Sequence, residues 1–434
     1  MKRFLVFFIL ILCINSPAFA VDEVDLEFDR DFQKHSLNIV STEELAAKSK
    51  EDLSESVDDE PKDVEDIDIL NLPLPEIVVT EETAPLTFYS KIQKEITKTM
   101  KDIYKLPIED TETITPLFKE RLTAHYAKGP ISSLYTRAIV QSNFDLFMPQ
   151  DGDEYGKFNV NLVNVLFDAK TRSGKDMFRV MIDPSHQHNL SFMQNFFKDL
   201  FIETKRIPHH SILIGNSRVG TGLEGLQSAY TLPFMFRSQI SRNFSNVRKI
   251  GVRVRGDYKY VDYDFGGYSS DTFFTDFMPG GEFNSWVEVK PFAKTKGKYG
   301  DLRTGTGISA GKRNSTGYVV GGVGLKYSYK KMWTQMEYSV ANGSNGATGL
   351  SSKHRQGWYV TLGCKLTKKL EFLARYDEFD PDKSVGHNNR KEYTTGINYY
   401  IKGQALKLVL NYIYCHNKGL SNSHRFMVGA QIAI

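Results

Sequence analysis

The sequence predicts an all-β fold, a transmembrane antiparallel β-barrel of about 16 strands, preceded by a disordered acidic extension and a short helix. One observation is that apolar and polar residues alternate in segments of about ten residues, as in strands with one lipid-facing side. The other is that short and long connections alternate between these segments. Outer-membrane barrels show this second pattern because their periplasmic turns are tight and their extracellular loops are long.

The alternation is clearest near the C-terminus. From Leu406 to Tyr414, leucines and tyrosines occupy every second position, and Lys407, Val409 and Asn411 fall between them. The last segment repeats the pattern, with Phe426, Val428, Ala430, Ile432 and Ile434 on one side. A period of two residues indicates strands that present one apolar face.

The connections between these segments differ in length and character. Lys330-Lys331 and residues 367–369 are short and basic, whereas residues 341–355, 379–391 and 415–424 form longer polar stretches. Because the last strand follows a long connection, we expect the C-terminus on the periplasmic side.

Residues 1–20 have the pattern of a cleaved secretory signal peptide. Lys2 and Arg3 precede an apolar stretch, and Ala18-Phe19-Ala20 fits a cleavage site of small residues. The apolar stretch is shorter than the roughly 20 residues that a membrane-spanning helix needs. The pattern predicts export from the cytoplasm, with a mature chain that begins near Val21, and the barrel pattern predicts the outer membrane as its destination.

Residues 21–87 are predicted to be a disordered acidic extension. Residues 21–70 contain 18 Asp and Glu against 5 Lys and Arg, a net charge of −13, whereas residues 71–434 have a net charge of +14. High like charge with few aromatic residues favours disorder. A solvated linker, a periplasmic tether and an electrostatic gate beside a basic pore are all compatible with this composition.

Residues 88–130 are expected to form a short amphipathic helix and a connector. Apolar residues recur at helical spacing from Phe88 to Ile103, and Pro107 ends the pattern. Docking on the barrel rim, a trimeric coiled-coil stub and a membrane-surface helix all remain open for this segment.

The barrel itself is expected at residues 131–434. Residues 219–247 lie between two predicted strands and either fold inward to narrow the lumen or form an ordinary surface loop. The predicted strands are residues 133–147, 157–170, 175–183, 196–206, 209–216, 248–256, 258–268, 284–292, 301–311, 318–329, 332–341, 356–366, 370–378, 392–401, 404–415 and 425–434.

No cofactor or metal site is expected. His186-Gln187-His188 and His209-His210 lack a carboxylate or cysteine at ligand spacing. Cys364 and Cys415 lie on predicted strands that two other strands separate, so we expect two buried thiols rather than a disulfide. Export through the signal peptide argues against a nucleic-acid partner.

The C-terminal region resembles the outer-membrane porins of the phosphate-selective O/P type. Three stretches support the resemblance: Arg375 to Pro381, Thr395 to Tyr400, and Leu406 to Tyr412. A further match runs from Ile214 to Arg237. The resemblance implies a 16-stranded barrel, usually trimeric, that passes small anions by diffusion. The chain departs from the family at Val219-Gly220, where a proline-led turn is usual, and at Ile434, where the family ends in an aromatic residue.

Six basic residues are candidates for a pore lining that binds anions. Val252 and Val254 share one strand face, so Arg253 and Arg255 should point into the lumen, because a charge facing lipid costs about 2–4 kcal/mol. Lys259 continues this face if no bulge intervenes. Arg218, Arg237 and Arg242 lie in or beside the 219–247 segment, and guanidinium groups suit phosphate-like anions.

Two other functions compete with a porin. A structural outer-membrane anchor would use residues 21–106 to bind a periplasmic or cell-wall partner. A phospholipase-type barrel would use His416, Ser421 and Asn422, but no ordering motif surrounds these residues. The sequence favours a porin in outer-membrane lipid, without enzymatic activity, that passes small anions, and the resemblance implies a homotrimer.

Overall fold

The computed structural model describes residues 94, 97–98, 116–184, 196–219, 221–271, 278–295, 297–418 and 421–434. The expected signal peptide, the acidic extension and most of the 88–115 segment lie outside the described residues. Of the expected helix, only Lys94, Thr97 and Lys98 are described, and all three are helical. No helix in the described part of the chain has the length and apolar character needed to cross a membrane.

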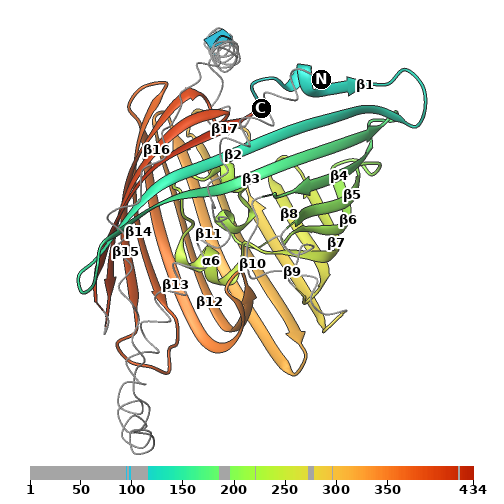
Figure 1. The fold of residues 1–434 in the computed structure, drawn as a ribbon. Helices are drawn as coiled ribbons and strands as arrows, with labels where there is room; N and C mark the ends of the chain where they lie inside the picture. The colour runs from blue at the N-terminus through green and yellow to red at the C-terminus, as the bar shows by residue number, and fades with distance from the viewer. Residues whose placement is uncertain are drawn as a thin grey trace, which may run out of the picture. The chain divides into compact units, whose positions relative to one another are not determined.

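Sixteen antiparallel strands form a closed barrel (Figure 1). Each strand from β2 pairs with the next along the chain, and β17 pairs with β2 to close the ring. Every predicted strand corresponds to one of them, so the predicted fold class is confirmed. Their bounds are β2 Ile131–Pro149, β3 Tyr155–Thr171, β4 Asp176–Ile182, β5 Phe197–Thr204, β6 His210–Arg218, β7 Arg248–Asp257, β8 Val261–Ser269, β9 Gly281–Val289, β10 Asp301–Arg313, β11 Thr316–Tyr329, β12 Met332–Gly346, β13 Gly349–Lys365, β14 Leu370–Asp380, β15 Arg390–Lys402, β16 Leu406–Asn417 and β17 Ser423–Ala433.

The two faces of the strands have opposite character. Outward-facing residues such as Phe158, Ile250 and Val428 are 60%, 47% and 50% exposed, although all three are apolar. Inward-facing Lys407 and Asn411 are buried at 1% and 0%. An apolar exterior and a polar interior are expected of a barrel surrounded by lipid.

A short segment at the seam between β2 and β17 precedes the barrel. The 3-10 helix η2 (Lys119–Leu122) leads into β1 (Thr123–His125), which pairs with the first residues of β2. The backbone N–H of Leu117 donates to the carbonyl of Ala433 at 3.1 Å. The connector is therefore tied to the rim of the barrel that carries the C-terminus, hereafter the C-terminal rim.

The connection at residues 341–355 differs from the expected long loop. β12 continues to Gly346 and β13 begins at Gly349, which leaves a two-residue turn. Residues 314–315 likewise form a two-residue turn at the same rim, so short and long connections alternate only in part. Packing explains the difference, because the hairpin tip contacts the inside of the barrel: Ala347 N–H donates to the carbonyl of Ser245 at 3.1 Å.

Residues 219–247, hereafter the constriction segment, fold into the barrel. The segment contains α5 (Leu223–Leu226), η3 (Ala229–Thr231) and α6 (Gln239–Phe244). All six residues of α6 are buried, and Figure 1 shows α6 enclosed by the barrel strands. The inward fold, one of the two alternatives, is therefore correct, and the surface loop is wrong.

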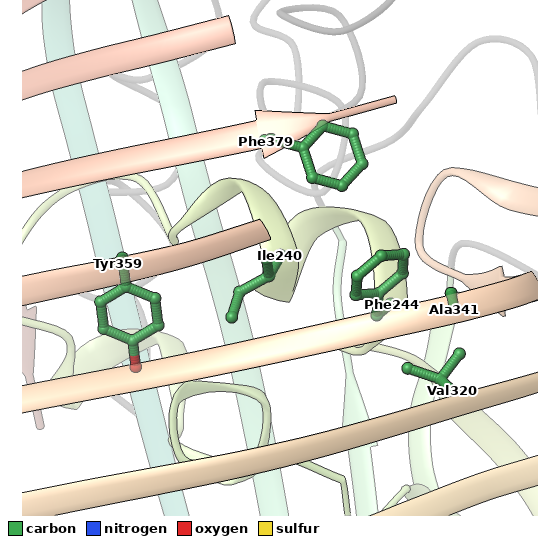
Figure 2. Packing of buried hydrophobic residues seen from close by; sticks show 6 residues of the cluster. All are labelled: Ile240, Phe244, Val320, Ala341, Tyr359 and Phe379. Carbon is green, nitrogen blue, oxygen red and sulfur yellow. The ribbon is translucent and has the colours of Figure 1, made fainter. Parts of the chain in front are cut away.

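An apolar cluster holds α6 against the barrel wall. Figure 2 shows the α6 side chains Ile240 and Phe244 among four wall residues, Val320, Ala341, Tyr359 and Phe379. The rings of Phe244 and Phe379 lie 5.7 Å apart. Ser238 precedes the helix, and its side chain accepts a hydrogen bond from Ser241 N–H, which caps the helix start.

A glycine lets this helix approach the wall. A Cβ atom at Gly357 of β13 would lie 2.6 Å from Ile240 Cγ2 and 2.8 Å from the carbonyl oxygen of Glu378. We expect Gly357→Val to push α6 away from the wall and lower the free energy of unfolding by roughly 1–3 kcal/mol. Urea denaturation of the detergent-refolded protein measures this loss. Gly321→Val is the control, because nothing lies within 4 Å of a Cβ atom there, and equal stability of the two variants would contradict the prediction.

Candidate pore and its constriction

A cavity of about 350 Å³ lies between the constriction segment and the inner wall formed by β3 to β7. Leu226, Ser228, Ala229 and Tyr230 line it from the constriction segment. This cavity, hereafter the upper chamber, is the open space beside the segment that narrows the barrel.

The upper chamber is strongly basic. Within the described part of the chain, only two acidic residues line it, Asp199 and Glu203. Seven basic side chains line it: Arg179, Lys198, Lys205, Arg218, Arg248, Arg253 and Arg255.

Most of these basic groups are held by carboxylates that lie deeper in the wall. Arg255 bonds to Glu203 at 2.6 Å, and their side chains are 41% and 7% exposed. Arg179 bonds to Asp168 at 2.7 Å with exposures of 26% and 8%, and Arg248 bonds to Asp199 at 2.7 Å. The carboxylates fix the cations in place, while the cations present more of their surface to the lumen.

A second cavity of about 710 Å³ continues toward the C-terminal rim. It is lined by the turn at residues 205–210 and by groups of both signs, including Asp262, Glu288, Lys290 and Arg303. Lys205, Leu226 and Arg255 line both cavities. We call this second cavity, which is the one nearer the C-terminal rim, the lower chamber, and we call the three residues that border both chambers the neck.

Three of the six candidates line the upper chamber. Arg255 lies in the neck, and Ser211 provides a second contact to its Nη2 at 3.2 Å. Arg253 Nε donates to Asp264 Oδ1 at 2.8 Å, and its Nη1 donates to the carbonyl of Arg218 at 2.6 Å. Arg218 Nη1 donates to Asn246 Oδ1 at 2.7 Å, which ties β6 to the end of the constriction segment.

Two other candidates are buried inside the constriction segment. Arg242 bonds to Glu392 of β15 at 2.6 Å, and both side chains are at most 3% exposed. Arg237 donates to the carbonyl of Gln227 at 2.7 Å and to that of Glu224. Neither residue lines the two chambers. Arg242 ties the segment to the barrel wall, whereas Arg237 bonds to carbonyl groups of the segment itself.

The placement of Lys259 differs from the expectation. β7 ends at Asp257, and Lys259 lies exposed in the turn before β8. The strand pattern cannot extend through the turn, because the chain reverses direction there.

Four basic residues of the upper chamber were missed in the sequence. Arg179, Lys198, Lys205 and Arg248 lie on or next to β4, β5 and β7. Strand alternation alone could have placed Arg179 inside, because its neighbours Phe178 and Val180 point outward. The apolar Met181 on the same inner face obscured this signal.

The remaining candidates are the histidine pairs, the possible hydrolytic set of His416, Ser421 and Asn422, and the two cysteines. No three His, Cys, Asp or Glu side chains there could hold a metal; His186 and His188 lie outside it. His416 lies on β16, not in a loop, and its Nδ1 is 2.9 Å from Asn422 Oδ1. Cys364 and Cys415 are both free.

One protein-family model matches the C-terminal third of the chain. Residues 292–432 match the family model described as phosphate-selective porin O and P, which leaves the Ile214 to Arg237 stretch outside the match. No curated protein matches the chain.

Solved structures share the fold. The outer membrane channel DcaP of Acinetobacter baumannii is 11% identical, with 72% of this chain and 100% of that chain covered and a TM-score of 0.53. A loop-deletion mutant of OmpT from Vibrio cholerae is 11% identical over 69% and 99% of the chains, with a TM-score of 0.52. An anion-selective porin from Comamonas acidovorans is 12% identical over 69% and 99%, with a TM-score of 0.52.

Because these identities are low, the solved structures support the barrel architecture alone. The family match over residues 292–432 supports the functional class, an outer-membrane porin. The chain is an outer-membrane porin that resembles the phosphate-selective porin O and P family over residues 292–432.

Proposed function

We propose that this porin passes small anions by passive diffusion through the upper chamber, the neck and the lower chamber. The observation that carries the proposal is the unequal exposure of paired charges along the upper chamber. The Arg255 side chain is 41% exposed and that of its partner Glu203 is 7% exposed. In the Arg179–Asp168 pair, the arginine is likewise the more exposed partner. An ion in the passage therefore meets guanidinium groups before it meets carboxylates.

Such an arrangement selects by charge. Fixed cations in a narrow, poorly solvated passage attract anions more strongly than the same charges would in bulk water. Guanidinium groups also offer paired N–H donors to oxyanions. The Arg253–Asp264 pair differs, because Arg253 is 8% exposed and Asp264 11%, so Arg253 contributes less to the field.

Planar-bilayer recording of the full chain tests the proposal. In a KCl gradient at low salt, the reversal potential should show chloride preference. The preference should weaken toward 1 M salt, where the screening length falls to about 3 Å. A potassium preference, or a barrel that does not conduct, would contradict the proposal.

The assembly and the N-terminal region remain predictions. We expect a homotrimer and a cleaved signal peptide, which cross-linking in native membranes and mass spectrometry of the mature chain would test. For residues 21–106, a periplasmic or cell-wall partner stays an alternative to a solvated linker with no specific partner. The rival anchor function would show itself as a closed barrel whose residues 21–106 retain peptidoglycan in a pull-down.

A further inference from the structure

Apolar side chains line part of the upper chamber. Leu162, Met181, Phe201 and Leu213 come from four adjacent strands, β3 to β6. Leu226 of the constriction segment lines the same cavity. The interior of such barrels is usually polar, so this row of four residues, hereafter the apolar strip, is not needed to keep the barrel in lipid.

The inward-facing apolar residues beside α6 have a packing partner. Val320, Ala341, Tyr359 and Phe379 are covered by α6 (Figure 2). The apolar strip instead borders open space, although each of its side chains is at most 7% exposed. The constriction segment thus covers one apolar part of the wall and leaves a narrow one beside the passage.

Cationic groups border the apolar strip directly. Phe201 pairs in register with Arg179, and the Arg179 guanidinium lies 5.5 Å from the centre of the Phe201 ring. Leu213 pairs in register with Arg253 on one side and with Glu203 on the other. A solute in the chamber can therefore place a negative group on a guanidinium and an apolar body on the strip.

We propose that the upper chamber favours organic monocarboxylates with an apolar body over inorganic phosphate. This inference rests on the proposed anion passage. A carboxylate accepts paired hydrogen bonds from an arginine as phosphate does, but only the organic anion gains from contact between its hydrocarbon part and the strip. The chamber volume of about 350 Å³ is enough for such a solute.

A homologous series of carboxylates tests the inference. Acetate, butyrate and hexanoate are added to the intact porin in a planar bilayer, with phosphate for comparison, and the concentration that halves the chloride current is measured. Burying one methylene fully is worth up to about fourfold in affinity. The strip exposes little surface, so we expect a smaller gain of up to about twofold per methylene. Hexanoate should also bind more tightly than phosphate.

Two variants locate the effect. Leu162→Asn combined with Leu213→Asn keeps the number of side-chain heavy atoms. This variant should bind the three carboxylates with similar affinity, whatever their chain length, while chloride preference persists. Leu166→Asn is the matched control, because Leu166 lies four residues along β3, is buried and does not line the chamber; it should leave the series unchanged. Heat-modifiable migration in electrophoresis verifies that each barrel is folded.

The unmodified porin alone decides the question if a variant fails to fold. A series without chain-length dependence, or tighter binding of phosphate than of hexanoate, would overturn the inference and leave the anion passage standing. Potassium preference in the KCl gradient would remove the anion passage itself, and the inference with it.

Discussion

Replacing Arg255 with glutamate should weaken or invert the anion preference of the porin. Arg255 lies in the neck and lines both chambers, and its side chain is 41% exposed. A unit charge about 8 Å from a passing ion is worth on the order of 2 kcal/mol at an effective dielectric constant of about 20, before screening. The substitution changes the charge by two units, so the chloride-to-potassium permeability ratio should fall at least about tenfold.

Reversal potentials at 0.1 M KCl measure this change. Arg206→Glu is the matched control, since Arg206 lies in the turn after β5, is 69% exposed and lines neither chamber. The hydrogen bond to Asp176 raises the pKa of Arg206, so the control removes a full positive charge as well. An unchanged ratio in a folded Arg255→Glu barrel would place the ion path elsewhere.

Arg255 is a better test residue than Arg253. The Arg253 side chain is 8% exposed, bonds to Asp264 and donates to the carbonyl of Arg218. A glutamate at the more exposed position 255 can turn into the lumen, away from Glu203. Reversing the charge of Arg253, in contrast, would set two carboxylates against each other where both side chains are at most 11% exposed. A change in selectivity would then be mixed with a change in structure.

Replacing Arg242 with alanine should loosen the constriction segment and raise the single-channel conductance. The Arg242–Glu392 pair joins α6 to β15 and is almost fully buried. Removing one partner of a buried ion pair costs roughly 3–5 kcal/mol, because the remaining charge loses its counter-ion. The barrel strands do not depend on this pair, so we expect a folded, wider and noisier channel.

Conductance in 1 M KCl and urea denaturation measure the two effects together. An exposed pair serves as the control: Lys353→Ala removes the 3.4 Å contact with Asp382 at a site where the lysine is 56% exposed. Exposed pairs contribute less than about 1 kcal/mol, so neither readout should change. Normal conductance with reduced stability in Arg242→Ala would show that the segment keeps its position without the pair.

Local pattern was enough to predict the strands. Alternation placed the leucine and tyrosine face of β16 and the Phe426 and Val428 face of β17 outward. The valines of β7 showed which way Arg253 and Arg255 point. The 341–355 stretch was misread because its glycines, serines and asparagines favour loops. Contacts with the constriction segment, which are remote in sequence, hold it as a hairpin.

The ion pairs could not be predicted from pattern. Arg242 meets Glu392 across 150 positions, and Arg248 meets Asp199 across 49. These partners depend on strand register and on the path of the constriction segment, and neither is encoded locally. Several basic residues could therefore be identified as lumen candidates from the sequence. The sequence could not show which of them face the solute and which anchor the constriction segment.

The seam between β2 and β17 has a consequence for how the molecule is made. Arg425 of β17 bonds to Asp145 of β2 across 280 positions, and Ile434 pairs its backbone with Ala138. Contacts so distant in sequence form late during folding. Until they form, the unpaired backbone edges of β2 and β17 are exposed and prone to aggregation. We therefore expect assembly to depend on a chaperone that shields both edges until the barrel closes.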